Sequence, residues 1–151
     1  MPRPETTDES KHAGQSGVDR DLLDALVQTS FSVMSILNRH AARNDLSLTQ
    51  VRLLGILRDR QPKMAELAAH LGLEKSTVSG LVDRAAHRGL VQRIADPDDA
   101  RAARVALTPR GREVATSGAT DIATDTAALI APLSAAERAQ LVELLRRVAP
   151  R

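Results

Sequence analysis

The sequence predicts a mainly α protein with a small β wing of two or three strands. Six segments place apolar residues at the three- and four-residue spacing of an amphipathic helix. Two short apolar stretches, Leu90–Ile94 and Arg104–Leu107, flank a loop with one proline and three aspartates, which is typical of a β-hairpin. Hydrophobic residues make up 42% of the 151-residue chain but aromatic residues only 1%, so the predicted core is aliphatic. This length suits one domain, or one domain with an extension.

Composition excludes several classes of protein. The chain has no cysteine, which excludes disulfides, thiolate metal sites and thiol-based sensing. No apolar run approaches the roughly 20 residues of a membrane span. Residues 1–17 lack the apolar core of a signal peptide. We therefore expect a cytoplasmic protein without a cofactor, a metal or a membrane partner.

The first 43 residues divide into a polar arm and a long helix. Residues 1–17 contain prolines, glycines and mixed charges without an apolar period, which predicts a disordered arm. From Asp19 to Arg43 the apolar residues have helical spacing, with acidic residues near the start and basic residues near the end, as the helix dipole favours. A helix of about 25 residues is roughly 37 Å long, so we expect it to pack against more than its own domain.

Three shorter helices are predicted next. Ser47 and Gln50 form a capping-box pattern before a helix that ends near Arg60. A third helix is expected over residues 63–70 and a fourth over 74–88. A glycine follows each of these two helices, where a helix C-terminus favours a left-handed residue.

The last part of the chain is expected to form the hairpin and two more helices. Thr108 and Pro109 have the types preferred at the cap and first position of a helix, which we expect to continue to about Ile130. Ser134 and Glu137 form a second capping box. The sixth helix then carries Leu141, Val142, Leu144, Leu145 and Val148.

The order of helix, turn, helix and two strands within residues 49–107 is the layout of a winged helix-turn-helix, which places one helix in a DNA major groove. This segment holds 10 Lys/Arg and 7 Asp/Glu, a net charge of +3. Residues 1–48 hold 5 and 7, net −2, and residues 108–151 hold 6 and 5, net +1. The positive excess on the central segment is consistent with a polyanionic partner, or with an ordinary mixed-charge surface.

The outward face of the fourth helix carries residues suited to DNA. Serine and threonine are small enough to let a helix enter a groove, and lysine and arginine bind phosphates or guanine. Gly80 costs the helix about 1 kcal/mol relative to alanine, which indicates close approach of DNA or, alternatively, room for a neighbouring side chain. The predicted contacts on this helix are Lys75, Ser76, Thr77, Ser79, Gly80 and Arg84, with Asp83 on the same face.

The predicted hairpin tip adds further DNA contacts. Arg101 stands on a narrow loop that can enter a minor groove, with Arg104 behind it. Asp99, two residues away, is expected to hold Arg101 by a charge-assisted hydrogen bond. The alternative is a plain solvated turn.

These residues carry a specific resemblance. The run LAxxLGLxxSTVSxLVDRxxxxGLVxR, followed by DPDDAR and VALTPRG, resembles the MarR family of bacterial transcriptional regulators. Many families share the helix-turn-helix pattern, whereas the wing sequence running into Leu-Thr-x-x-Gly is more selective. The resemblance covers about residues 19–149. It implies a winged helix-turn-helix DNA-binding domain in 49–107 and dimerisation helices in 18–48 and 108–151.

The resemblance also implies how the protein acts on DNA, and that it is associated with the nucleoid. Helix 74–88 would read the major groove and the 95–103 wing the minor groove of a palindromic double-stranded operator, usually as a homodimeric repressor. Members often release DNA on binding a small phenolic anion between the dimerisation helices and the winged helix. The positions here that fit such a site are Met34, Leu37, His40, Arg43, Met64, His70 and Arg93.

Each of these positions also has a plainer interpretation. Met34 and Leu37 fit core positions, the two histidines fit ordinary surface or helix-end positions, and Arg93 fits a contact with phosphate or an acidic neighbour. With one aromatic residue in the chain, a small anionic or aliphatic effector suits the site better than a polyaromatic one.

Other functional classes are disfavoured or stay open. The chain has no phosphate-binding glycine loop, nucleophile elbow or metal triad, so we expect no enzyme. The aspartates of the wing lack the spacing of a calcium loop. A winged helix used for protein contact, and a DNA-binding protein without a sensing role, remain alternatives.

Overall fold

The computed structural model describes residues 10–99 and 101–148. Within them lie six helices and one two-stranded antiparallel sheet, which confirms the predicted mainly α fold with a β wing. The chain divides into two compact units, Met1–Ser35 and Ile36–Arg151. The elements are α1 (Ser10–Arg43), α2 (Leu48–Asp59), α3 (Met64–Leu71), α4 (Lys75–His87), β1 (Val91–Ala95), β2 (Ala103–Leu107), α5 (Pro109–Ile130) and α6 (Ala135–Val148).

The first helix starts earlier than the sequence pattern indicates. α1 begins at Ser10, so the predicted start at Asp19 is wrong, as is an arm without helix over residues 10–17. Residues 1–9 of that predicted arm lie outside the described residues. An apolar period marks where a helix has an apolar face, whereas helical hydrogen bonds extend one residue at a time into polar sequence that contains no proline.

The predicted caps are confirmed atom by atom. Ser47 Oγ accepts from the backbone N–H of Gln50 at 3.2 Å, and Gln50 Oε1 accepts from the backbone N–H of Ser47 at 2.9 Å. Ser134 and Glu137 form the same reciprocal pair before α6. Gly72 and Gly89 follow α3 and α4 with φ of 66° and 69°, in the left-handed region that glycine adopts without strain.

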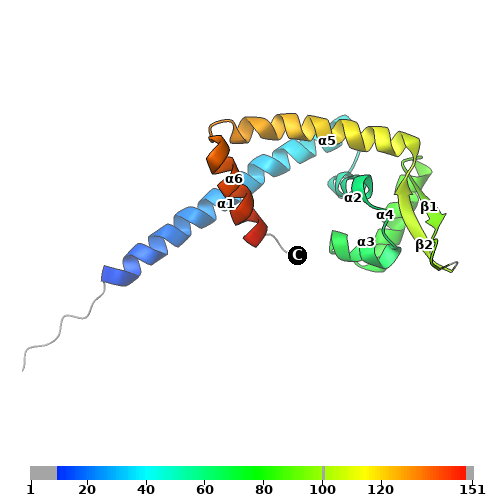
Figure 1. The fold of residues 1–151 in the computed structure, drawn as a ribbon, viewed down its shortest axis with the longest axis horizontal. Helices are drawn as coiled ribbons and strands as arrows, with labels where there is room; N and C mark the ends of the chain where they lie inside the picture. Colours follow the sequence, from blue (N-terminus) through cyan, green and yellow to red (C-terminus); the bar gives the residue numbers. More distant parts are fainter. Residues whose placement is uncertain (1–9, 100, 149–151) are drawn as a thin grey trace, which may run out of the picture. The chain divides into compact units, whose positions relative to one another are not determined.

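The core of the second unit lies among α2, α3, α4 and the hairpin, which gather near the start of α5 in Figure 1. Residues Val91 and Leu107 pair at one end of the β1–β2 ladder, and Ala95 and Ala103 at the other. An isolated bridge between Lys63 and Arg104 adds a third segment to the wing. The side chains with almost no exposure are Leu53, Leu57, Leu67, Val78, Val82 and Val105.

The Leu-Thr-x-x-Gly motif joins the wing to α5. Thr108 Oγ1 accepts from the backbone N–H of Gly111 at 2.9 Å, as an N-cap does, and donates to the carbonyl oxygen of Gly89 at 2.6 Å. A Cβ atom at Gly111 would lie 1.8 Å from the carbonyl oxygen of Leu90. The motif therefore contains glycine because helix and wing backbones approach too closely for any side chain.

Two of the helices, α1 and α6, each expose several large apolar side chains. In the unit Met1–Ser35, α1 exposes Leu23 and Phe31 by 61% and 65%. In the other unit, α6 has no buried residue, and its Val142, Leu144, Leu145 and Val148 are 45–71% exposed. Of the helices in the described part of the chain, none combines the length and apolar character needed to cross a membrane.

Candidate nucleic-acid interface

The fourth helix is amphipathic and presents its polar face to solvent. Its apolar residues Val78, Leu81, Val82 and Ala85 are buried and anchor it to the core. This inward anchoring fixes which residues remain outside. The predicted contacts Lys75, Ser76, Thr77 and Arg84, and Asp83 with them, are exposed, whereas Ser79 and Gly80 are half-buried.

Gly80 makes room for a neighbouring side chain. A Cβ atom at this position would lie 3.3 Å from Nη1 of Arg84, one turn further along α4. The absence of a side chain thus lets the Arg84 guanidinium fold back along the helix. The guanidinium is the end of a flexible side chain and needs to shift by only a few tenths of an ångström to admit a Cβ atom. The contact therefore does not by itself require glycine, and close DNA approach at Gly80 stays a prediction.

Arg93 projects from β1 towards the polar face of α4. Its Nη1 atom lies 2.8 Å from Oδ1 of Asp83, and its Nη2 atom donates to Ser79 Oγ at 3.4 Å. Arg93 was predicted to line a ligand pocket, and its observed partners instead belong to the helix with the candidate DNA contacts. The structure thus realises the alternative of a contact with an acidic neighbour.

The wing is organised around a buried carboxylate. Asp96 is 3% exposed, and its Oδ1 atom accepts from the backbone N–H groups of Asp98 and Asp99 at 2.8 and 3.2 Å. Its Oδ2 atom lies 2.8 Å from Nε of Arg104 and 3.3 Å from Nζ of Lys63. One side chain thereby holds the turn, the second strand and the segment before α3 together.

These contacts keep the carboxyl group charged. Burial acts to raise the pKa of Asp96, but hydrogen bonds from Arg104, from the backbone of Asp98 and from Lys63 outweigh burial and lower the pKa to about 2. The same carboxylate raises the pKa of Arg104 through its hydrogen bond. The sequence identifies Asp96 only as part of an Asp-Pro-Asp-Asp turn and not as a site residue. Its two cationic partners, Lys63 and Arg104, lie in other segments of the chain.

The two predicted wing arginines have different surroundings. Arg104 is half-buried and bonds to Asp96, with Oδ2 of Asp98 a further 3.5 Å from its Nη2 atom. Arg101 is exposed at the tip. Oδ1 of Asp99 accepts from the backbone N–H of Arg101 at 3.0 Å, so Asp99 holds the backbone of the turn at Arg101. The predicted hydrogen bond from the Arg101 guanidinium to Asp99 is a different one.

Replacing Asp96 by Asn should destabilise the protein at neutral pH, and less so in acid. Its pKa is about 2 in the folded chain against an ordinary 3.8. The stabilisation is therefore complete above pH 3.8 and is lost as the pH falls towards 2. An amide has no charge to lose, so the difference in unfolding free energy between wild type and variant should shrink over this range. Urea denaturation followed by circular dichroism at about pH 7, 4 and 3 measures the difference.

The neighbouring Asp98→Asn variant is the matched control. Its carboxylate also faces Arg104 but is 82% exposed, so its removal should change stability little at any of these pH values. A stability difference for Asp96→Asn that stays constant from about pH 7 to 3 would contradict the assigned role of the charge.

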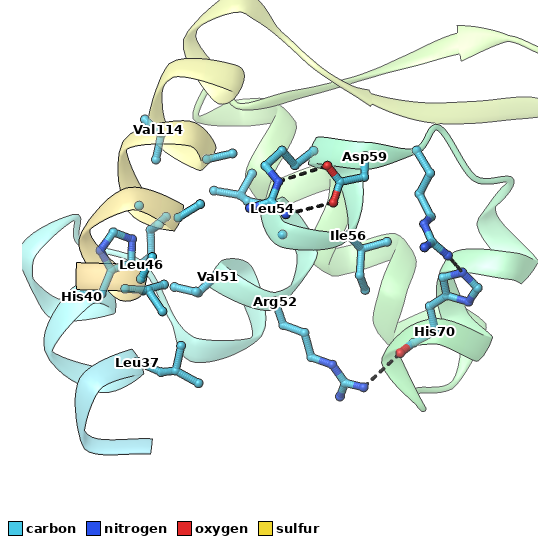
Figure 2. A pocket seen from close by; sticks show the side chains of 18 of the residues that line it. Leu37, His40, Leu46, Val51, Arg52, Leu54, Ile56, Asp59, His70 and Val114 are labelled. Carbon is cyan, nitrogen blue, oxygen red and sulfur yellow. Dashed lines mark hydrogen bonds and ion pairs between the residues drawn. The ribbon is translucent and has the colours of Figure 1, made fainter. Parts of the chain in front are cut away.

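A pocket of about 1250 Å³ opens beside the winged helix-turn-helix within the second unit. Figure 2 shows Leu37 and His40, near the end of α1, on one side and His70, on α3, on the other. The lining also includes apolar residues of α2 and α5, among them Val51, Leu54 and Ile122. The lining contains no aromatic ring other than histidine, so it suits an aliphatic or small ring-bearing molecule.

His40 is the buried polar group of this pocket. It is 5% exposed, and a Cβ atom at Gly118 of α5 would lie 2.4 Å from its Nε2 atom. Gly118, which the sequence shows only as a weak point of α5, therefore accommodates the imidazole. Asn44, one turn after His40, donates from Nδ2 to the His40 carbonyl oxygen at 3.0 Å.

The opposite side of the pocket is cationic. Arg52 donates to the carbonyl oxygens of Leu71 and His70 at 3.0 and 2.9 Å, which ties α2 to the end of α3. Nη1 of Arg60 lies 2.7 Å from Nε2 of His70. These groups give the pocket a side that favours an anion and a side that favours apolar atoms.

An ion pair adds to the polar part of the lining. A hydrogen bond from Arg58 lowers the pKa of Asp59, and the same bond raises the pKa of Arg58. Both groups are therefore charged at neutral pH, and the guanidinium of Arg58 is already engaged by its neighbour.

The predicted ligand residues separate into two groups. Leu37, His40 and His70 line the pocket, whereas its lining does not include Arg43, Met64 or Arg93, so the assignment of these three to the same site stays a prediction that this pocket does not support. Met64 packs against the core and Arg43 is exposed at the end of α1. Met34 belongs to the unit Met1–Ser35, where it is 39% exposed.

Comparisons with known proteins agree with this architecture. A family model described as MarR family matches residues 44–102, and no curated protein matches the chain. A probable transcriptional regulator from Pseudomonas aeruginosa is 31% identical with a TM-score of 0.69, over 87% of this chain and 99% of that chain.

Two further solved structures have the same fold. Wild-type MarR from E. coli, in its apo form, is 24% identical with a TM-score of 0.68, over 85% of this chain and 97% of that one. CouR from Rhodococcus jostii, bound to p-coumaroyl-CoA, is 23% identical with a TM-score of 0.74, over 85% and 91%. The family match and the 31%-identical regulator show that this chain belongs to the MarR family of transcriptional regulators.

Proposed function

We propose that the chain binds a palindromic operator in double-stranded DNA as a homodimer and represses transcription until a small molecule releases it. In this proposal residues 49–107 form the DNA-binding domain, and residues 18–48 and 108–151 the dimerisation helices. The observation that carries the proposal is α4, whose apolar face is anchored in the core while Lys75, Ser76, Thr77 and Arg84 face solvent. A helix held in this way presents short polar and cationic groups to a groove.

The wing supports a second DNA contact. Asp96 and Asp99 fix the backbone of the turn by side-chain hydrogen bonds, so Arg101 stands on a braced loop. An exposed arginine on a braced narrow loop suits a minor groove, whose negative potential attracts cations. Arg104 forms an ion pair with Asp96. We propose that Arg104 stabilises the wing in addition to making its predicted DNA contact.

A second copy of the chain would cover the apolar side chains that α1 and α6 each expose. Removing apolar side chains from water contributes roughly 1.5–3 kcal/mol for each large residue that becomes fully buried. A two-fold dimer presents two recognition helices, which explains a palindromic operator with half-sites about one DNA turn, ~34 Å, apart.

The pocket beside α2 supports a small-molecule effector. Leu37 and His40 lie at one side and His70 with Arg60 at the other, which suits an apolar molecule with an anionic group. The related structure of CouR holds p-coumaroyl-CoA. We propose an anionic effector with an aliphatic or phenolic body, bound in the cell compartment that holds the operator DNA, the bacterial cytoplasm.

A salt titration of DNA binding tests the proposal. A duplex selected from a random pool by the wild-type protein should bind with an affinity that falls steeply with salt, with a slope near −0.9 per phosphate contacted. Arg101→Ala should weaken binding by ~1–3 kcal/mol, about 5- to 150-fold, without unfolding the protein. Gel-shift titrations at several salt concentrations measure both quantities.

Arg146→Ala is the matched control, because it removes the same charge from an exposed position on the polar side of α6, outside the proposed DNA contacts. A protein-contact module would show little salt slope and no selected sequence, which would refute DNA recognition. Unchanged affinity of Arg101→Ala would refute the role of the wing alone.

A further inference from the structure

The contacts of Arg93 link the wing to the polar face of α4. Ser79 and Asp83 are four residues apart on α4, so their side chains lie on the same face of the helix. Arg93 reaches both, at 2.8 Å to Oδ1 of Asp83 and 3.4 Å to Oγ of Ser79. The three side chains therefore form one cluster on the surface that the proposed function turns towards DNA.

The cluster neutralises a negative charge on the proposed recognition helix α4. Asp83 places a carboxylate, 57% exposed, among the residues proposed to meet a polyanion. An unpaired carboxylate there would repel DNA phosphates, and close approach would remove the water that screens it. The guanidinium of Arg93 neutralises this charge from outside the helix, so α4 keeps the positive contribution of Lys75 and Arg84.

The same guanidinium sets the direction of the Ser79 hydroxyl. A serine hydroxyl has one hydrogen to donate and can accept from other donors, whereas an arginine side chain only donates. Because Ser79 Oγ accepts from Arg93, its own hydrogen points to another acceptor. On this face of the helix the acceptors that DNA offers are phosphate oxygens and base acceptors.

We propose that Arg93 is a positioning residue for DNA recognition, which neutralises Asp83 and orients the Ser79 hydroxyl as a donor towards DNA. The inference rests on the proposed function and deepens it. It also separates Arg93 from the effector pocket, whose lining does not include it. Arg93 acts through its neighbours and makes no phosphate contact of its own.

Three variants test the assignment with the duplex selected by the wild-type protein. Arg93→Gln should weaken binding about 10-fold, a change of ~1.4 kcal/mol, because it leaves the Asp83 carboxylate unpaired. Asp83→Asn alone should bind at least as tightly as the wild type. The double variant Asp83→Asn/Arg93→Gln should recover most of the affinity lost in Arg93→Gln, since the repelling charge is gone.

The salt slope of the double variant identifies how Arg93 acts. With both charges removed the net charge of the pair is unchanged, so a positioning role leaves the wild-type slope intact. A direct phosphate contact by Arg93 would lower the slope by about 0.9 for each copy of the chain on the duplex. Circular-dichroism melting of all variants checks the fold, which the loss of an exposed ion pair should change little.

The outcomes separate the two proposals. If the wild type selects a duplex but the double variant stays as weak as Arg93→Gln, or its salt slope falls, the positioning role is overturned while DNA recognition stands. If the wild type selects no sequence, DNA recognition is overturned and the role of Arg93 with it. Recovery of affinity at an unchanged slope supports the positioning role.

Discussion

The Gly111→Ala variant should be less stable than the wild type by at least about 3 kcal/mol. The added Cβ atom would lie 1.8 Å from the carbonyl oxygen and 2.8 Å from the carbonyl carbon of Leu90. Leu90 cannot move aside freely, because its N–H donates to Ala85 and its carbonyl oxygen accepts from Thr108. Relief of the clash must therefore break the junction between wing and α5. Urea denaturation followed by circular dichroism at fixed protein concentration measures the loss, since the chain has no tryptophan.

Gly55→Ala provides the matched control. Gly55 also lies inside a helix, α2, and a Cβ atom there meets nothing within 4 Å. Alanine is favoured over glycine in a helix by up to about 1 kcal/mol, so Gly55→Ala should stabilise the protein. Opposite signs for the same substitution in two helices would show that backbone approach, and not helix propensity, determines the effect at Gly111. A stabilised Gly111→Ala variant would contradict the observed junction.

The features that the sequence predicted well depend on neighbours along the chain. The capping box at Ser47 needs only a residue three positions later, and the left-handed glycines at 72 and 89 follow directly from the end of a helix. The hairpin likewise follows from a turn between two apolar stretches. Local geometry sets these features, so residue types at fixed spacing are sufficient to locate them.

The features that the sequence missed depend on contacts between elements. Arg93 meets Asp83 only because β1 docks beside α4, and either an acidic neighbour or a ligand was consistent with the sequence alone. Asp96 looks like a turn residue until the pairing of Lys63 with Arg104 brings two cations to its carboxylate. Such roles depend on which side chains meet in the folded protein, and the spacing of residues along the sequence does not reveal these contacts.

Gly118 and Gly111 illustrate the same limit from the side of packing. In the sequence, Gly111 stands near the start of the fifth helix and Gly118 in its interior. The sequence does not indicate which residues from other elements lie beside either glycine. In the structure Gly111 faces the backbone of Leu90, whereas Gly118 faces the ring of His40. The backbone of Leu90 is rigid, so Gly111 is needed for the fold. The ring of His40 lies at the effector pocket, so Gly118 shapes the candidate binding site.

Leu144→Asp in α6 should convert the proposed dimer into monomers and abolish operator binding. α6 has 14 residues and none is buried, although a helix of this length is marginal in water without packing partners. Leu144 is 47% exposed among other apolar residues of α6. In a two-fold interface each substitution occurs twice, and burying an unpaired carboxylate costs several kcal/mol. Sedimentation velocity and gel-shift titration measure the two consequences.

Ala139→Asp separates an interface effect from a helix effect, because it introduces the same residue into the same helix. Ala139 stands one turn before Glu143, which lies on the polar side of α6 and pairs with Arg146. If α6 contributes to the dimer through its apolar side, Ala139→Asp should remain dimeric and bind the operator while Leu144→Asp does neither. If both variants become monomeric, loss of the helix itself is responsible, and if Leu144→Asp remains dimeric, the apolar side of α6 is not the interface. The measurement thus decides whether the exposed apolar residues of α6 join two copies of the DNA-binding domain, on which the two-fold operator depends.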